Sequence, residues 1–190
     1  MKRRAPHIPL RRPVYVGCEG ASEASYANLL RDLLHDAQLP VHLVVQTLGQ
    51  GAGDPLARIE LAAINLAHLR RTRTAPEDRF VLLDFDQAER DPKRADRAQV
   101  LAGNHDITIL WQRPCFEAVL LRHIEGCDTH RPPNTSTAEK ALLRQWPEYA
   151  KPMTRAALGK RIDRASVLRA AAVEPGLDIF LRCVGLISTA

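Results

Sequence analysis

Carboxylates stand directly after several of the apolar segments that this 190-residue sequence predicts to be β-strands. Glu19 follows the first such segment, and Glu23 lies four residues further on. Asp84 and Asp86 close a later segment, and Glu117 follows the last one. The carboxyl ends of parallel strands line the crevice in which α/β proteins bind ligands, so these acids are candidates for one site. Crowded carboxylates either take up a proton or bind a cation, and hard oxygen donors suit Mg²⁺ or Mn²⁺.

A metal held by such acids can activate water and stabilise the transition state of phosphodiester cleavage. Ordinary structural roles compete with this interpretation. Glu23 and Glu117 fall in first turns of predicted helices, where carboxylates interact well with the helix dipole, and Asp86 fits a turn cap. Glu19 and Asp84 are harder to explain in this way, because each abuts an apolar strand. Spacing of two residues places Asp84 and Asp86 on one face if their segment is extended.

The elements that position these acids alternate between strands and helices. Short apolar runs predict strands, and helical spacing of apolar residues between them predicts helices. Buried strands separated by helices indicate parallel pairing with right-handed crossovers. We therefore predict an α/β fold: a doubly wound, mainly parallel four-stranded sheet flanked by helices, with a helical C-terminal part. The predicted strands are 14–18, 41–45, 80–85 and 107–111.

Local signals place the helix starts and divide the chain. Ser22 can cap the first helix, and Asp54 with Pro55 can start the second. Pro114 precedes a third helix, and a charged segment, 86–104, leads into the last strand. The loop that follows is rich in Pro, Thr, Asn and Ser, and short helical patterns run from it to the C-terminus. We expect a basic tail over 1–12, an α/β core over 13–125, and a loop and helical region over 126–190.

Composition narrows the class of protein. The formal net charge is +5, and hydrophobic residues make up 45% of the chain, which is typical of a globular protein. No apolar run is long enough to span a bilayer, and the basic N-terminus is not followed by the apolar region of a signal peptide. The four cysteines are widely spaced and form no CxxC pair, which favours a reducing, cytoplasmic location.

Positive charge gathers in two segments that flank an acidic middle. Residues 1–12 carry five bases and no acid, and residues 139–170 carry eight bases and three acids. Basic segments suit a polyanion such as nucleic acid. A solvated tail and an ordinary basic helix face are the alternative explanation, and for a charge run taken alone this explanation is the commoner one.

Three motifs of the chain resemble the signatures of the RloB-like proteins, a branch of the TOPRIM nuclease fold. They are CEGASE (18–23), DFD (84–86) and PCFEAVLLRH (114–123), and the resemblance covers most of residues 13–151. Ser22 stands where the family usually has Thr, and the segment between DFD and the fourth strand is short. The resemblance implies a TOPRIM-like core, metal-dependent phosphodiester cleavage of DNA or RNA, including tRNA, and a role in bacterial defence against phage.

The same resemblance implies roles for individual residues. Asp84 and Asp86 would hold Mg²⁺ or Mn²⁺, with Glu19 as a further ligand or general acid/base. Glu23 would act with them as a catalytic acid, and Glu23 and Glu117 would support these ligands or hold a second metal ion. The remaining matched residues are Glu117 as a metal ligand, His123 and Lys151 as contacts to phosphate or to a carboxylate, and Tyr149, which with Lys151 fits a familial Tyr-x-Lys. Separately from the resemblance, the positive charge of Arg11 and Arg12 in the basic flank would guide nucleic acid.

Two other classes of function stay open. The chain could be a non-catalytic subunit that binds nucleic acid or a partner ATPase, and it could form homo-oligomers. It could also be a phosphatase or phosphotransferase, since DxD occurs in such sites. An acidic crevice favours the enzyme, because a pure polyanion binder gains nothing from it.

Three further patterns are weaker signals. Gly49-x-Gly51-x-Gly53 lacks the GK[ST] of a phosphate-binding P-loop. Cys115, His123, Cys127 and His130 lack the ligand spacing of a structural zinc site. Trp111, Trp146 and Tyr149 can stack nucleic-acid bases, but aromatic residues make up only 5% of the chain, so core packing is their first explanation.

Overall fold

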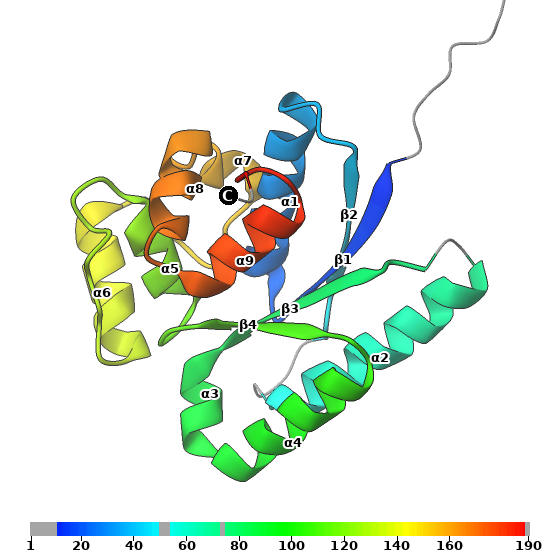
Figure 1. The fold of residues 1–190 in the computed structure, drawn as a ribbon. Coiled ribbons are helices and arrows are strands. Elements are labelled where there is room, and N and C mark those ends of the chain that lie inside the picture. Colours follow the sequence, from blue (N-terminus) through cyan, green and yellow to red (C-terminus); the bar gives the residue numbers. More distant parts are fainter. Residues whose placement is uncertain (1–10, 50–53, 73–74, 189–190) are drawn as a thin grey trace, which may run out of the picture.

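The computed structural model describes residues 11–49, 54–72 and 75–188, and a four-stranded sheet lies at its centre (Figure 1). The strand order is β2-β1-β3-β4, and every neighbouring pair is parallel. This arrangement confirms the predicted fold class and is consistent with a TOPRIM-like fold. The strands are β1 (Arg12–Cys18), β2 (Val41–Thr47), β3 (Asp78–Asp84) and β4 (Thr108–Gln112).

The chain reverses its direction across the sheet at the β1–β3 pair. From β1 it moves outward to β2, and it then returns across β1 to β3 and continues to β4. Right-handed crossovers in opposite directions place their helices on opposite faces. Helix α1 (Ala21–Asp36) therefore covers one face, whereas α2 (Pro55–Thr72) and α4 (Pro92–Asn104) cover the other (Figure 1). The β1–β3 pair is the switch point at which such folds bind ligands.

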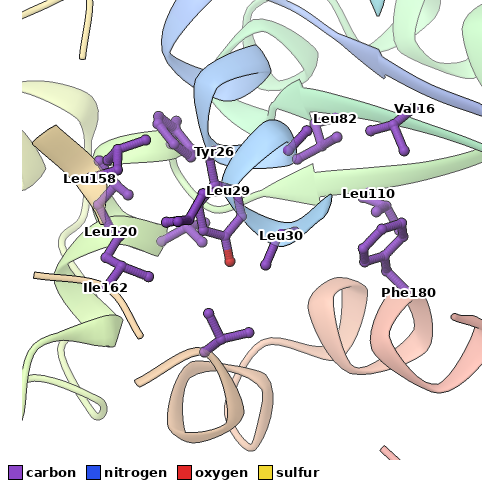
Figure 2. Close-up of a cluster of buried hydrophobic side chains, with 14 of the residues drawn as sticks. Val16, Tyr26, Leu29, Leu30, Leu82, Leu110, Leu120, Leu158, Ile162 and Phe180 are labelled. Carbon is purple, nitrogen blue, oxygen red and sulfur yellow. The ribbon is translucent and has the colours of Figure 1, made fainter. Parts of the chain in front are cut away.

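Alternate residues of the strands point to opposite faces of the sheet and belong to two hydrophobic cores. Val16, Leu82 and Leu110 point to the α1 face, where they meet Tyr26 and Phe180 (Figure 2). The intervening residues, which include Tyr15, Val81 and Leu83, join the core beneath α2 and α4. Because both faces are covered, the strands are apolar throughout, as expected for a buried parallel sheet.

Most of the remaining helices cover the α1 face of the sheet. They are short, and their apolar residues belong to the same core as α1: Leu158, Val167 and Phe180 are at most 2% exposed. No helix among the described residues is long and apolar enough to cross a membrane. These helices are α5 (Phe116–His123), α6 (Thr135–Gln145), α7 (Arg155–Leu158), α8 (Arg164–Ala171) and α9 (Pro175–Cys183).

Several local predictions need correction. Ser22 does not cap α1, because the helix already begins at Ala21 and Gly20 is the N-cap residue. The Ser22 hydroxyl instead accepts a hydrogen bond from the Met153 backbone N–H at 3.1 Å. The charged segment 86–104 lies almost entirely in two helices, α3 (Phe85–Arg90) and α4. Asp91 caps α4, with Pro92 in its first turn. The predicted loop after α5 is also shorter than expected, because α6 begins at Thr135.

Candidate active site

Glu19 and Asp84 meet at the carboxyl ends of the two central strands. Cys18, the last residue of β1, pairs with Leu82 of β3, so Glu19 lies beside the end of β3. One carboxylate oxygen of Glu19, Oε2, accepts a hydrogen bond from the Asp84 backbone N–H at 3.1 Å. Asp84 Oδ1 in turn accepts one from the Phe116 N–H, at 2.8 Å. Residues distant in sequence therefore form one hydrogen-bonded cluster at the switch point.

Asp86 lies near these acids, but on a helix and not on the strand that the sequence predicts. The strand ends at Asp84, and α3 begins at Phe85, so Asp86 lies in the first turn of a helix and the expectation of an extended DxD segment is wrong. The backbone N–H of Asp86 donates to the Pro114 carbonyl at 3.0 Å. Its side chain accepts a hydrogen bond from the Thr135 hydroxyl at 2.8 Å. The turn thus aims Asp86 toward the start of α6.

Glu117 is the most deeply buried acid of the group, at 1% exposed. Its Oε1 accepts a hydrogen bond from the Tyr149 hydroxyl at 2.6 Å and lies 2.5 Å from the Lys151 ammonium. Lys151 also contacts Glu139 at 3.0 Å. Glu23 is 8% exposed on α1. The loop after α6 therefore supplies the cation and the hydroxyl that hold the Glu117 carboxylate.

Burial and mutual repulsion raise the pKa values of several of these acids. Burial raises the pKa of Asp84 to about 9, and the charges of Glu23, Glu19, Glu117 and Asp86 contribute to the rise. Burial, with the charges of Glu19 and Glu117, raises the pKa of Glu23 to about 7. Burial also raises the pKa of Glu19, although the Asp84 N–H and the positive charge of Arg58 oppose it.

Glu117 departs from this trend. Burial alone would raise its pKa, but the contacts with Lys151 and Tyr149 outweigh burial and lower it. Burial lowers the pKa of Lys151, but its contacts with Glu117 and Glu139 outweigh burial and raise that pKa above its ordinary value. The Lys151–Glu117 ion pair therefore lies beside Glu19, Glu23 and Asp84, carboxylates whose charges are less well compensated.

The donor set of the site fits Mg²⁺ or Mn²⁺ in chemistry. Carboxylate oxygens are the ligands that these ions prefer, and the buried atoms Glu117 Oε2 and Asp86 Oδ1 have no hydrogen-bond partner among the described residues. The side chains are turned to protein partners, and within the described ranges no three His, Cys, Asp or Glu side chains form a ready metal-binding group. If a metal binds, Asp84, Asp86 and Glu19 are the residues placed to hold it, after rotation of their side chains.

His123 belongs to the core and not to a nucleic-acid surface. It is 1% exposed, its Nδ1 donates to the Val119 carbonyl at 2.8 Å, and its Nε2 accepts from the Tyr26 hydroxyl at 2.9 Å. Burial lowers the pKa of His123 to about 4, so the ring is neutral at pH 7. Both ring nitrogens form hydrogen bonds inside the core, so the structure does not place His123 where it could contact a phosphate.

Arg11 and Arg12, the two described residues of the basic N-terminal flank, lie at the opposite end of the strands from the acids, and residues 1–10 lie outside the described residues. Arg12 opens β1, six residues before Cys18, so a rise of about 3.3 Å per residue places it roughly 20 Å from the acids. Arg12 pairs with Asp78 and donates to the Cys183 carbonyl at 2.7 Å. Arg11 is exposed at the same end. Neither residue lies at the candidate site.

The structure also brings residues to the site that sequence reasoning missed. Arg58 of α2 is 6% exposed and donates to the carbonyls of Leu48 and Gly49, and its charge opposes the rise in the pKa of Glu19. Thr135 contacts Asp86, as described above. A buried arginine has no signature in the sequence, but Asn134 before Thr135 is a helix-cap signal. Of the glycine loop, only Gly49 lies within the described residues.

The chain belongs to the RloB-like protein family. The family model matches residues 14–174, which span the sheet, all the carboxylates described above, and α5 to α8. No curated protein and no solved structure matched the chain.

Proposed function

We propose that the protein is a Mg²⁺- or Mn²⁺-dependent phosphodiester hydrolase, a nuclease, that acts on DNA or RNA. The observation that carries the proposal is the meeting of Glu19 and Asp84 at the switch point, with Asp86, Glu23 and Glu117 around them. Like charges gathered in a partly buried cluster destabilise a fold, and a divalent cation removes that cost.

Each residue has a role in this proposal. Asp84 and Asp86 hold the ion, and Glu19 is a further ligand or accepts the proton of the attacking water. When bound, the ion would lower the pKa of a water and stabilise the charge that develops on the phosphate. Lys151 neutralises Glu117, which leaves Glu117 to support the neighbouring carboxylates or to contribute its free oxygen. The exposed bases of 139–170 supply positive charge for a polyanion. Family membership supports a role in bacterial defence.

Cleavage of labelled nucleic acids by the purified protein tests the proposal. Single-stranded and duplex DNA and RNA, including tRNA, are incubated with Mn²⁺, with Mg²⁺ or with EDTA. We expect cleavage with a divalent ion alone, and a loss of at least about 100-fold in rate for Asp84→Asn and Glu19→Gln. Asp96→Asn is the matched control, because Asp96 is an exposed acid outside the site.

The other classes of function predict different results. Nucleic-acid binding without cleavage under every condition indicates a non-catalytic subunit. Hydrolysis of a small phosphate ester with no cleavage of nucleic acid indicates a phosphatase. Full activity of Asp84→Asn would contradict the proposed site.

A further inference from the structure

Asp86 is held by a residue from outside the α/β core. Thr135 is the first residue of α6, and its hydroxyl donates to Asp86 Oδ2 at 2.8 Å. The other oxygen, Asp86 Oδ1, is buried and has no hydrogen-bond partner among the described residues. One oxygen is thus fixed by the hydroxyl while the other remains available.

The position of the Thr135 hydroxyl is itself well determined. Asn134 caps α6 by accepting a hydrogen bond from the Thr137 N–H at 2.9 Å, which fixes the first turn of the helix. Helix α6 packs along α5, the helix that carries Glu117. On the other side, the Asp86 backbone N–H is tied to the Pro114 carbonyl. Both ends of the Thr135–Asp86 hydrogen bond are therefore anchored.

Arg90 contacts the same oxygen of Asp86 but controls it less. The distance from Arg90 Nη2 to Asp86 Oδ2 is 3.3 Å, and the Arg90 side chain is 67% exposed. Exposed ion pairs of this kind contribute little, because solvent and salt screen them. The half-buried Thr135 hydroxyl, which lies closer to Asp86 Oδ2 at 2.8 Å, is the partner that selects the orientation of Asp86.

We propose that Thr135 is a positioning residue for Asp86 in the candidate site. This inference rests on the proposed function, since its benefit is a carboxylate oriented to receive a divalent ion. The first turn of α6 also forms one wall of a groove of about 410 Å³ beside Asp86, and α3 forms the other. The start of α6 therefore completes the site, although it lies outside the sheet and its crossovers. Groups that orient a ligand typically change metal affinity about 10- to 100-fold when they are removed.

Titration of the full-length, metal-free protein with Mn²⁺, followed by calorimetry and by the electron paramagnetic resonance signal of free Mn²⁺, tests this role. We expect Thr135→Val to weaken Mn²⁺ binding about 10- to 100-fold, and Thr135→Ser, which keeps the hydroxyl, to bind within about threefold of the wild type. Thr137→Val is the matched control, because Thr137 is an exposed threonine in the same turn. Circular dichroism and thermal unfolding in EDTA show whether each variant folds, and Thr135→Ala replaces Thr135→Val if the latter does not.

The outcomes separate this inference from the proposed function. Wild-type protein that does not bind Mn²⁺ overturns both. Wild-type binding with unchanged affinity in Thr135→Val overturns the role of Thr135 and leaves the metal site standing. Equal losses in Thr135→Val and Thr135→Ser also overturn it, because the hydroxyl would then not be the group that matters.

Discussion

At the scale of single residues, Asp84 combines three properties that rarely occur together in a purely structural acid. It ends strand β3, and its side chain accepts a hydrogen bond from the Phe116 N–H. It also lies near other carboxylates, whose charges raise its pKa: Glu19, Glu23, Asp86 and Glu117. A proton or a cation must compensate such a cluster. Groups that destabilise the fold at neutral pH are typical of functional sites, where activity is favoured over stability.

Replacing Asp84 with Asn should stabilise the metal-free protein at alkaline pH. The folded-state pKa of about 9 lies above the ordinary value of 3.8, so the native state holds a proton that the unfolded state releases. The contribution of Asp84 to stability is complete below pH 3.8 and is lost as the pH rises toward 9. Asn keeps the acceptor for the Phe116 N–H. We expect a gain of about 2 kcal/mol in the free energy of unfolding at pH 8 in EDTA, measured with urea.

The pH profile of that gain is the diagnostic feature. The difference between Asp84→Asn and the wild type should shrink toward zero near pH 4, where the carboxyl is already neutral. Asp96→Asn, which removes an exposed acid, should change the free energy of unfolding by no more than about 0.5 kcal/mol at either pH. A less stable Asp84→Asn at pH 8 would show that the charges are already compensated within the protein.

At the scale of elements, the sequence predicts strands better than helix boundaries. Each strand is an apolar run closed by polar residues, and burial on both faces of a parallel sheet requires that pattern. Segment 86–104 reads as charged because α3 and α4 have broad exposed faces, yet Asp91-Pro92 is a helix-start signal. Segment 126–138 is predicted as a loop, which holds for 126–134, and Asn134 marks the start of α6 within the segment.

Some residues of the candidate site could be predicted from the sequence and others could not. Glu19 and Asp84 could be placed from sequence, because the carboxyl ends of parallel strands meet at one edge whenever their strands are neighbours. The contact between Thr135 and Asp86 could not, because it depends on how a separate helix packs against the core. The burial of His123 in the core likewise depends on how helices pack together, so it could not be predicted from the residues around His123 in the sequence.

The C-terminal helices should unfold together with the sheet. Phe180 of α9 is 2% exposed and packs edge-to-face on Phe80 of β3, with ring centroids 5.2 Å apart. Phe180→Ala should therefore lower the free energy of unfolding by about 4 kcal/mol. Ile179→Ala is the matched control: Ile179 is 51% exposed, and its loss should cost no more than about 0.5 kcal/mol.

Circular dichroism and tryptophan fluorescence should report one coincident transition for Phe180→Ala, with the midpoint shifted in both. Two separated transitions would show that the C-terminal helices form an independent unit and that their contacts with the sheet contribute little to its stability.

At the scale of the whole molecule, the topology explains why the acids collect where they do. The chain reverses direction at β1–β3, so the crossovers leave a crevice at that edge, and α5 and the segments after it close its side. Arg11 and Arg12 lie at the opposite end of the strands, whereas the bases of 139–170 lie on the helical part that closes the site. A polyanion drawn to the acids by a metal would thus meet positive charge from the C-terminal part.

The same arrangement couples metal binding to pH. Asp84 and Glu23, with pKa values of about 9 and about 7, hold protons in the metal-free site at neutral pH, and a divalent ion must displace them. Affinity for Mn²⁺ should therefore rise between pH 6 and 8, by up to about tenfold per pH unit for each proton displaced. Titration calorimetry in buffers of different ionisation enthalpy measures the affinity and counts the protons released. Affinity that does not change over this range, with no proton release, would show that the ion binds elsewhere on the molecule.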